Sequence, residues 1–209
     1  MDILDPAITE YLNRLTPQAD PVREEMEKLG AERRFPIIGP AVGQLCFVMA
    51  RTIGARRVFE CGSGFGYSTL WFSRAVGPEG KVFHTDGSEE NSRQARDFLG
   101  RAGLASRVHF EVGDARDLLA ATEGPFDVIF NDIDKEGYPD VLPLVRDKLR
   151  VGGLFICDNM LWSGRVLAPA EEASTRGIQE LTRLLREAAD FTTTLVPIRD
   201  GVTVSLRIT

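Results

Sequence analysis

Short apolar runs alternate with longer stretches of helical spacing through most of the chain. The runs "RRVFEC", "KVFHTD", "VHFEVGD", "FDVIFND" and "GLFICDN" are each followed by a predicted helix. These helices begin at Tyr67, near Glu89, shortly after the third run, at Tyr138 and near Glu172. Five strand–helix alternations predict an α/β domain whose parallel sheet carries helices on both faces.

The two ends of the chain depart from this alternation. Near the start, "AITEYLNRL", "PVREEMEKLGAERRF" and "PAVGQLCFVMARTIG" predict three helices, the second opened by Pro21. Near the end, "RDG" separates "FTTTLVPI" from "VTVSLRI" and predicts a hairpin, so the last strand is antiparallel. We expect a Rossmann-like, doubly wound, mostly parallel sheet with a C-terminal antiparallel strand. One domain is predicted over residues 1–209, with a helical part at 1–54 and an α/β core at 55–209.

Composition excludes several classes of protein. The 209 residues are 43% hydrophobic, which suits one domain with a full core. A net charge of -6 disfavours general nucleic-acid binding, because phosphate contacts need a basic surface. No apolar run reaches about 18 residues, and we expect no signal peptide and no membrane span. Three widely spaced cysteines in apolar runs predict reduced thiols, so we expect a cytoplasmic protein without a membrane partner.

The ends of the first three strands carry the residues expected of a nucleoside site. "ECGSGFGYST" places Gly62, Gly64 and Gly66 at alternate positions before a helix, a spacing that differs from that of dinucleotide enzymes and also fits a simple tight turn. Asp86 follows about twenty residues later, where an acidic residue binds ribose hydroxyls or caps a helix. Asp114 ends the third strand, either as a cap or as an acceptor for the adenine amino group. Together these residues predict a nucleoside site.

Oxygen-bearing side chains end the fourth and fifth strands. Asp132 closes one, and Asp158 with Asn159 closes the other. Neighbouring strands lie about 4.8 Å apart, so three oxygen ligands would meet at one edge of the sheet. Such ligands suit Mg²⁺, Mn²⁺ or Ca²⁺. A helix cap explains any one of these residues, but it explains the two strand ends together poorly.

Four stretches, "ECGSGFGYSTLW", "GDA", "FNDIDKEGYPDVL" and "FICDNMLWSGRV", resemble the cation-dependent O-methyltransferase family. This family includes the catechol and caffeoyl-CoA O-methyltransferases and their bacterial relatives, and the resemblance spans residues 22–209. It implies the class I methyltransferase fold, S-adenosylmethionine as the methyl donor, and a homodimer. It also implies a divalent cation, Mg²⁺ before Mn²⁺ or Ca²⁺.

The resemblance also implies roles for individual residues. Asp132, Asp158 and Asn159 match the metal ligands, and Lys135 matches the catalytic base, with Asp132 beside it in the catalytic centre. The residues implied to contact the donor are Ile38, Glu60, Gly62, Ser63, Gly64, Ser68, Asp86, Gly87, Asp114, Ala115, Asp132 and Asp134. The chain departs from the family at Asn131, where isoleucine or valine is common.

We therefore expect a metal-dependent O-methyltransferase that acts on a hydroxyl of a small catechol-like or hydroxycinnamoyl-type molecule. Two alternatives stay open. A related bacterial branch methylates the wobble 5-hydroxyuridine of tRNA, against which the acidic net charge weighs. A nucleotide-binding oxidoreductase or an adenosine-binding module without activity would share the fold but not the glycine spacing.

Overall fold

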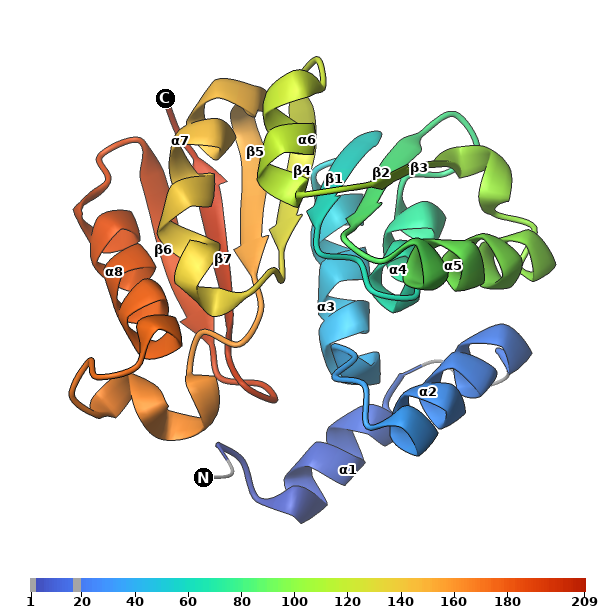
Figure 1. Ribbon diagram of the computed structural model, residues 1–209, viewed down its shortest axis with the longest axis horizontal. Coiled ribbons are helices and arrows are strands. Elements are labelled where there is room, and N and C mark those ends of the chain that lie inside the picture. The colour runs from blue at the N-terminus through green and yellow to red at the C-terminus, as the bar shows by residue number, and fades with distance from the viewer. Residues whose placement is uncertain (1–2, 17–19) are drawn as a thin grey trace.

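The computed structural model describes residues 3–16 and 20–209 and shows one seven-stranded sheet (Figure 1). The strands are β1 (Arg57–Cys61), β2 (Lys81–Asp86), β3 (Val108–Val112), β4 (Phe126–Asn131), β5 (Leu149–Cys157), β6 (Phe191–Val196) and β7 (Val202–Arg207). Their order is β3-β2-β1-β4-β5-β7-β6. The first five strands pair in parallel, and β7 lies antiparallel between β5 and β6. The predicted fold class is confirmed.

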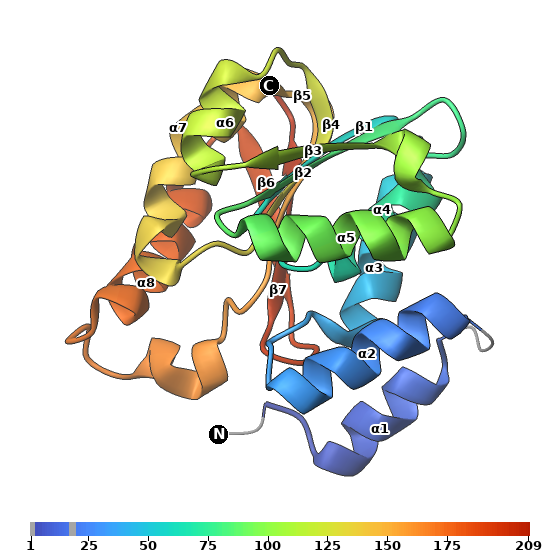
Figure 2. The ribbon, with the colours of Figure 1, turned by 45° about the vertical axis from the view of Figure 1, so that its right-hand side comes forward.

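Helices cover both faces of the sheet (Figures 1 and 2). They are α1 (Pro6–Arg14), α2 (Pro21–Arg33), α3 (Gly39–Thr52), α4 (Tyr67–Ala75), α5 (Glu89–Arg101), α6 (Ala115–Ala121), α7 (Tyr138–Lys148) and α8 (Ala173–Glu187). The 3₁₀ turns in the described part of the chain are η1 (Ala105–Arg107), η2 (Lys135–Gly137) and η3 (Trp162–Leu167). Within the described ranges, no helix combines the length and apolarity that crossing a bilayer requires.

Alternation along each strand divides the core into two layers. Val58 of β1 packs in the layer that contains α3, α4 and α5, whereas Phe59 packs with α6, α7 and α8. Successive side chains of a strand point to opposite faces, so strands that are apolar throughout can bury both. The sheet is therefore enclosed on both sides, and its carboxyl edge is left for polar residues.

Local capping explains why several helices begin where the sequence predicts. The Asp20 side chain accepts a hydrogen bond from the Arg23 amide, and Pro21 occupies the first helical position of α2. Ser88 caps α5 in the same way through the Asn91 amide. The beginnings of α4 at Tyr67 and α7 at Tyr138 match the prediction, and α8 begins one residue after the expected Glu172.

A buried histidine joins β2 to the helices above it. His84 is fully buried, and its Nδ1 and Nε2 lie 3.1 Å from the Thr69 hydroxyl and 3.3 Å from the Ser92 hydroxyl. Burial, with a smaller effect of the Arg96 charge, lowers the pKa of His84 to about 3. The folded protein therefore holds this imidazole neutral at pH values where the unfolded chain would protonate it.

We predict that His84 makes the protein sensitive to mild acid. Because its pKa is lower in the folded state, its effect is absent above about pH 6.5 and destabilises the fold increasingly below that, by about 1.4 kcal/mol at pH 5.5. Urea unfolding at pH 7.5 and 5.5 should show a smaller pH effect in His84→Gln than in the wild type. The control is His109→Gln, which changes an exposed histidine. An equal pH effect in all three proteins would contradict the prediction.

Candidate active site at the carboxyl ends of the strands

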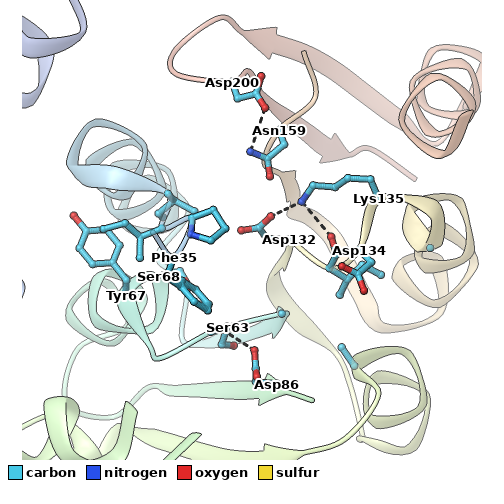
Figure 3. A pocket seen from close by; sticks show the side chains of 18 of the residues that line it. Phe35, Ser63, Tyr67, Ser68, Asp86, Asp132, Asp134, Lys135, Asn159 and Asp200 are labelled. Atoms are coloured by element: carbon cyan, nitrogen blue, oxygen red, sulfur yellow. Dashed lines mark hydrogen bonds and ion pairs between the residues drawn. The ribbon is translucent and has the colours of Figure 1, made fainter. Parts of the chain in front are cut away.

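A cavity of about 1200 Å³ opens at the carboxyl ends of the parallel strands (Figure 3). Its lining combines the segments that follow β1 to β5 with the N-terminal residues Ile3 and Leu4, the segment before α3, and the β6–β7 turn. The predicted site residues that line it are Ile38, Gly62, Ser63, Gly64, Ser68, Asp86, Gly87, Asp114, Ala115, Asp132, Asp134, Lys135 and Asn159. Glu60 and Asp158 lie beneath its surface, because both are buried.

The glycine turn after β1 brings the ends of two strands together. Gly62 has a φ of +81°, and a Cβ atom there would lie 2.6 Å from the backbone oxygen of Asp132. A Cβ at Gly64 would lie 2.8 Å from the Phe35 ring. Gly62 therefore requires glycine for conformation and for space, and Gly64 requires it for its φ of +52°. At Gly62 the close approach is to the protein's own backbone at the end of β4.

Asp86 fixes this turn from the end of β2. Its Oδ2 accepts a hydrogen bond of 2.8 Å from the Gly64 amide, and its Oδ1 accepts bonds from the Ser88 amide and the Asn91 side chain. The cap of α5 is Ser88, so the capping interpretation of Asp86 is wrong. The carboxylate borders the cavity with each oxygen held in place, which suits recognition of a polar ligand.

At the end of β3, Asp114 serves as a cap. Its Oδ1 accepts the Arg116 amide at the start of α6, and both oxygens also pair with the Arg116 guanidinium. These bonds hold the pKa of Asp114 at about 2, below its usual value. Ala115 beside it is nearly buried and presents a small apolar surface to the cavity.

Glu60 is a fully buried carboxyl group in the layer beneath the glycine turn. Neither of its oxygens has a hydrogen bond of ordinary geometry within the described residues. Burial raises its pKa to about 7, while the nearby hydroxyls of Ser68, Thr69 and Ser63 act in the opposite direction. Glu60 therefore lies below the turn, outside the lining of the cavity.

The two predicted acidic strand ends lie side by side. Asn131 of β4 stands opposite Cys157 of β5, so the next residues, Asp132 and Asp158, follow at the same level. Asn159 has a φ of +60°, a conformation that asparagine tolerates well. Its amide nitrogen lies 3.4 Å from Asp200 Oδ2, and Figure 3 shows its amide oxygen turned towards Asp132.

The burial and charges of Asp132 and Asp158 are suited to binding a cation. Burial and the neighbouring charge of Asp132 raise the pKa of Asp158, and burial raises that of Asp132. Asp158 Oδ1 is buried without a hydrogen-bond partner in the described structure. A divalent cation would satisfy that oxygen and offset the repulsion. Residues 3–16 and 20–209 contain no cluster of three or more His, Cys, Asp or Glu side chains that could hold a metal. The third ligand that the sequence predicts, Asn159, is an amide and so does not belong to these residue types.

Lys135 is held beside Asp132 in a nearly buried position. It is 8% exposed, and its Nζ lies 2.7 Å from Asp132 Oδ1 and 3.1 Å from the Ile133 carbonyl oxygen. The ammonium group also stands 4.9 Å from the centre of the Tyr138 ring. Behind it, a Cβ atom at Gly177 of α8 would lie only 2.1 Å from the Lys135 carbonyl oxygen. Close packing of α8 therefore determines where the Lys135 backbone lies.

Sequence reasoning missed several residues that line the cavity. Phe35 covers the glycine turn, Trp162 lies in the quoted "DNMLWSG" stretch, and Arg199 and Asp200 belong to the β6–β7 turn. Only Trp162 could have been found from the sequence, because it lies in a motif that also contains the predicted ligands Asp158 and Asn159. The "RDG" turn indicated only a hairpin, because nothing local shows that it packs beside Asn159.

Comparisons with known proteins identify close relatives of this architecture. The O-methyltransferase family model matches residues 18–208. The catechol O-methyltransferase of Mycobacterium tuberculosis is 34% identical over 146 residues, covering 69% of this chain and 66% of that protein. Caffeoyl-CoA O-methyltransferase 5 of Nicotiana tabacum is 30% identical over 180 residues, covering 80% and 75%. The crystal structure of the O-methyltransferase TomG of Streptomyces achromogenes in complex with SAM superposes with a TM-score of 0.89 at 26% identity, covering 97% and 96%.

We predict that Gly177→Ala destabilises the fold by about 1–3 kcal/mol, because the added methyl group overlaps the Lys135 backbone. The matched control is Gly100→Ala in α5, where an added Cβ meets no atom within 4 Å. That change should stabilise the helix by about 0.5–1 kcal/mol. Urea unfolding of the two variants and the wild type measures both effects, and equal stability of all three would refute the packing role of Gly177.

Proposed function

The chain belongs to the O-methyltransferase family and is an enzyme that uses S-adenosylmethionine, and from this premise we propose a metal-dependent reaction on an aromatic acceptor with two adjacent hydroxyls. The observation that carries the proposal is that Asp132 and Asp158 lie at adjacent strand ends. The buried Oδ1 of Asp158 has no hydrogen-bond partner in the described structure. Asp132 lines the same cavity as the glycine turn and Lys135, and Asp158 lies buried beneath it.

On the donor side, we assign the methionine part of S-adenosylmethionine to the turn Gly62–Gly64 and to Ser68. Asp86 would accept hydrogen bonds from the ribose hydroxyls, and the rigid hold on its carboxylate supports this role. The adenine would lie against Ala115, near Asp114. These contacts would direct the sulfonium methyl group towards Asp132 and Lys135, since the turn and the end of β4 are in contact.

On the acceptor side, Asp132, Asp158 and Asn159 would hold the divalent cation. When bound, the cation would orient two adjacent hydroxyls and lower the pKa of the one to be methylated. The aromatic ring would lie near Trp162 and the apolar N-terminal residues Ile3 and Leu4. Catalysis by these parts is mainly positioning and deprotonation.

Lys135 would take the proton of the acceptor hydroxyl at Nζ. The acceptor oxygen then bonds to the methyl carbon while the bond from carbon to sulfur breaks, which leaves S-adenosylhomocysteine. Asp132, at 2.7 Å, would stabilise the ammonium group that forms. Gly177 contributes by letting α8 press against the Lys135 backbone.

Metal dependence is the first prediction from this proposal. EDTA should abolish methylation of catechol, and added Mg²⁺ or Mn²⁺ should restore it, because only oxygen ligands are offered. Asp158→Asn should stay inactive with excess Mg²⁺ while it still binds S-adenosylhomocysteine by calorimetry. Asp147→Asn, at an exposed aspartate, serves as the control. Full turnover in EDTA would contradict the assignment.

The second prediction concerns the proton at Lys135. Lys135→Met keeps the apolar stem but removes the amine, so kcat should fall by about 10²- to 10⁴-fold while donor binding survives. Part of the loss should return at higher pH as the acceptor ionises unaided. The measurement is kcat against pH on catechol, with Lys28→Met as the control at an exposed lysine. Wild-type rates at neutral pH in Lys135→Met would exclude Lys135 as the general base.

A further inference from the structure

Three positively charged side chains line the cavity among the described residues: Arg116, Lys135 and Arg199. Two of them are neutralised, since Arg116 pairs with Asp114 and Lys135 pairs with Asp132, each at 2.7 Å. Arg199 has no ion pair or side-chain hydrogen bond with any residue in ranges 3–16 and 20–209. Its side chain packs beside Gly39, and its positive charge acts to lower the pKa values of Asp132 and Asp158, so it influences the strand ends without an ion pair to either carboxylate.

The backbone at Arg199 supports a role for this side chain. Its φ is +52°, in the left-handed region that glycine adopts easily and that other residues occupy at a cost in free energy. A long cationic side chain thus stands where glycine would relieve the strain. Strained residues of this kind gather at ligand-binding sites.

The turn that carries Arg199 is fixed against the proposed metal site. The next residue, Asp200, accepts a hydrogen bond from the Ser163 amide through its side chain and one of 2.8 Å from the Leu161 amide through its carbonyl oxygen. Its side chain also lies 3.4 Å from the Asn159 amide nitrogen. Figure 3 shows Asp200 and Asn159 together at one side of Asp132. The backbone at Arg199 is therefore held in place next to the proposed acceptor side of the cavity.

Two carboxylates that line the same cavity would also act on an anionic acceptor. Asp134 and Glu136 line the cavity and form no ion pair with a described residue. Figure 3 shows Asp134 on the other side of Asp132 from Asp200. A negatively charged group on the acceptor would be repelled by Asp134 and Glu136 and attracted by Arg199.

We propose that Arg199 binds a carboxylate of the acceptor, so that the enzyme prefers dihydroxylated aromatic acids to neutral catechols. This inference rests on the proposed function, because it specifies the acceptor of the same site. A guanidinium binds a carboxylate through two parallel charge-assisted hydrogen bonds. The expected preference concerns acceptor affinity, whereas Lys135 and the strand ends carry the chemistry.

The test compares two probes of equal size, 3,4-dihydroxybenzoate and 3,4-dihydroxybenzamide. Calorimetry measures the Kd of each with protein saturated with S-adenosylhomocysteine and Mg²⁺. The wild type should bind the benzoate more tightly, and Arg199→Gln should reduce that preference roughly fivefold to thirtyfold, as expected for one charged pair in a partly open cavity. Arg199→Gly removes the charge and relaxes the backbone, so it should give the same loss with an intact turn.

The controls separate this inference from the proposed function. Arg56→Gln removes the same charge at an exposed arginine outside the cavity and should keep the wild-type preference. An unchanged preference in both Arg199 variants would overturn the inference, as would tighter binding of 3,4-dihydroxyphenethylamine than of the benzoate by the wild type. If both probes bind but neither is methylated with S-adenosylmethionine and Mg²⁺, the proposed function fails instead, while the binding ratio still decides the role of Arg199. If neither probe binds, both proposals fail.

Discussion

The parallel pairing of β4 with β1 on one side and β5 on the other is the constraint on which the site depends. Asn131 stands opposite both Cys61 and Cys157, so Gly62, Asp132 and Asp158 leave the sheet at one level. The ladder continues one step further, because the Asp132 amide donates to the Cys61 oxygen and the Asp158 amide to the Asn131 oxygen. Neighbouring parallel strands thus bring the glycine turn and the carboxylate pair together without any loop having to hold them.

A buried polar layer supports this edge from below. Tyr138, at the start of α7, donates a hydrogen bond of 2.9 Å to the Asp158 carbonyl oxygen while its ring faces the Lys135 ammonium group. One side chain therefore positions the backbone of one acidic residue and the charge of the lysine. Asn131 is also buried in this layer, and its amide oxygen has no partner among the described residues. Nothing in the structure explains why the chain has a polar residue there.

The sequence predicted what depends on local chemistry. Strand ends, helix starts at Tyr67 and Tyr138, and the antiparallel end of the sheet follow from alternation, caps and turn residues, and the structure has them. The contacts that the sequence did not predict depend on packing between segments that are distant along the chain. Phe35 reaches Gly64 because α3 packs beside α4, and Asp200 reaches Asn159 because β7 lies next to β5. Burial of Glu60 and Asp158 below the cavity also depends on the complete fold, so their motifs alone could not show it.

The position of β7 between β5 and β6 has a consequence for how the protein is made. On the ribosome, β5 and β6 both emerge before β7 exists, so the apolar stretch of β5 remains an unpaired edge while α8 and β6 are synthesised. The same late strand brings the turn that carries Asp200 to Asn159. The contact of the Asp200 turn with Asn159 therefore forms only after β7 is made, and until then the exposed edge of β5 is open to aggregation or chaperone capture.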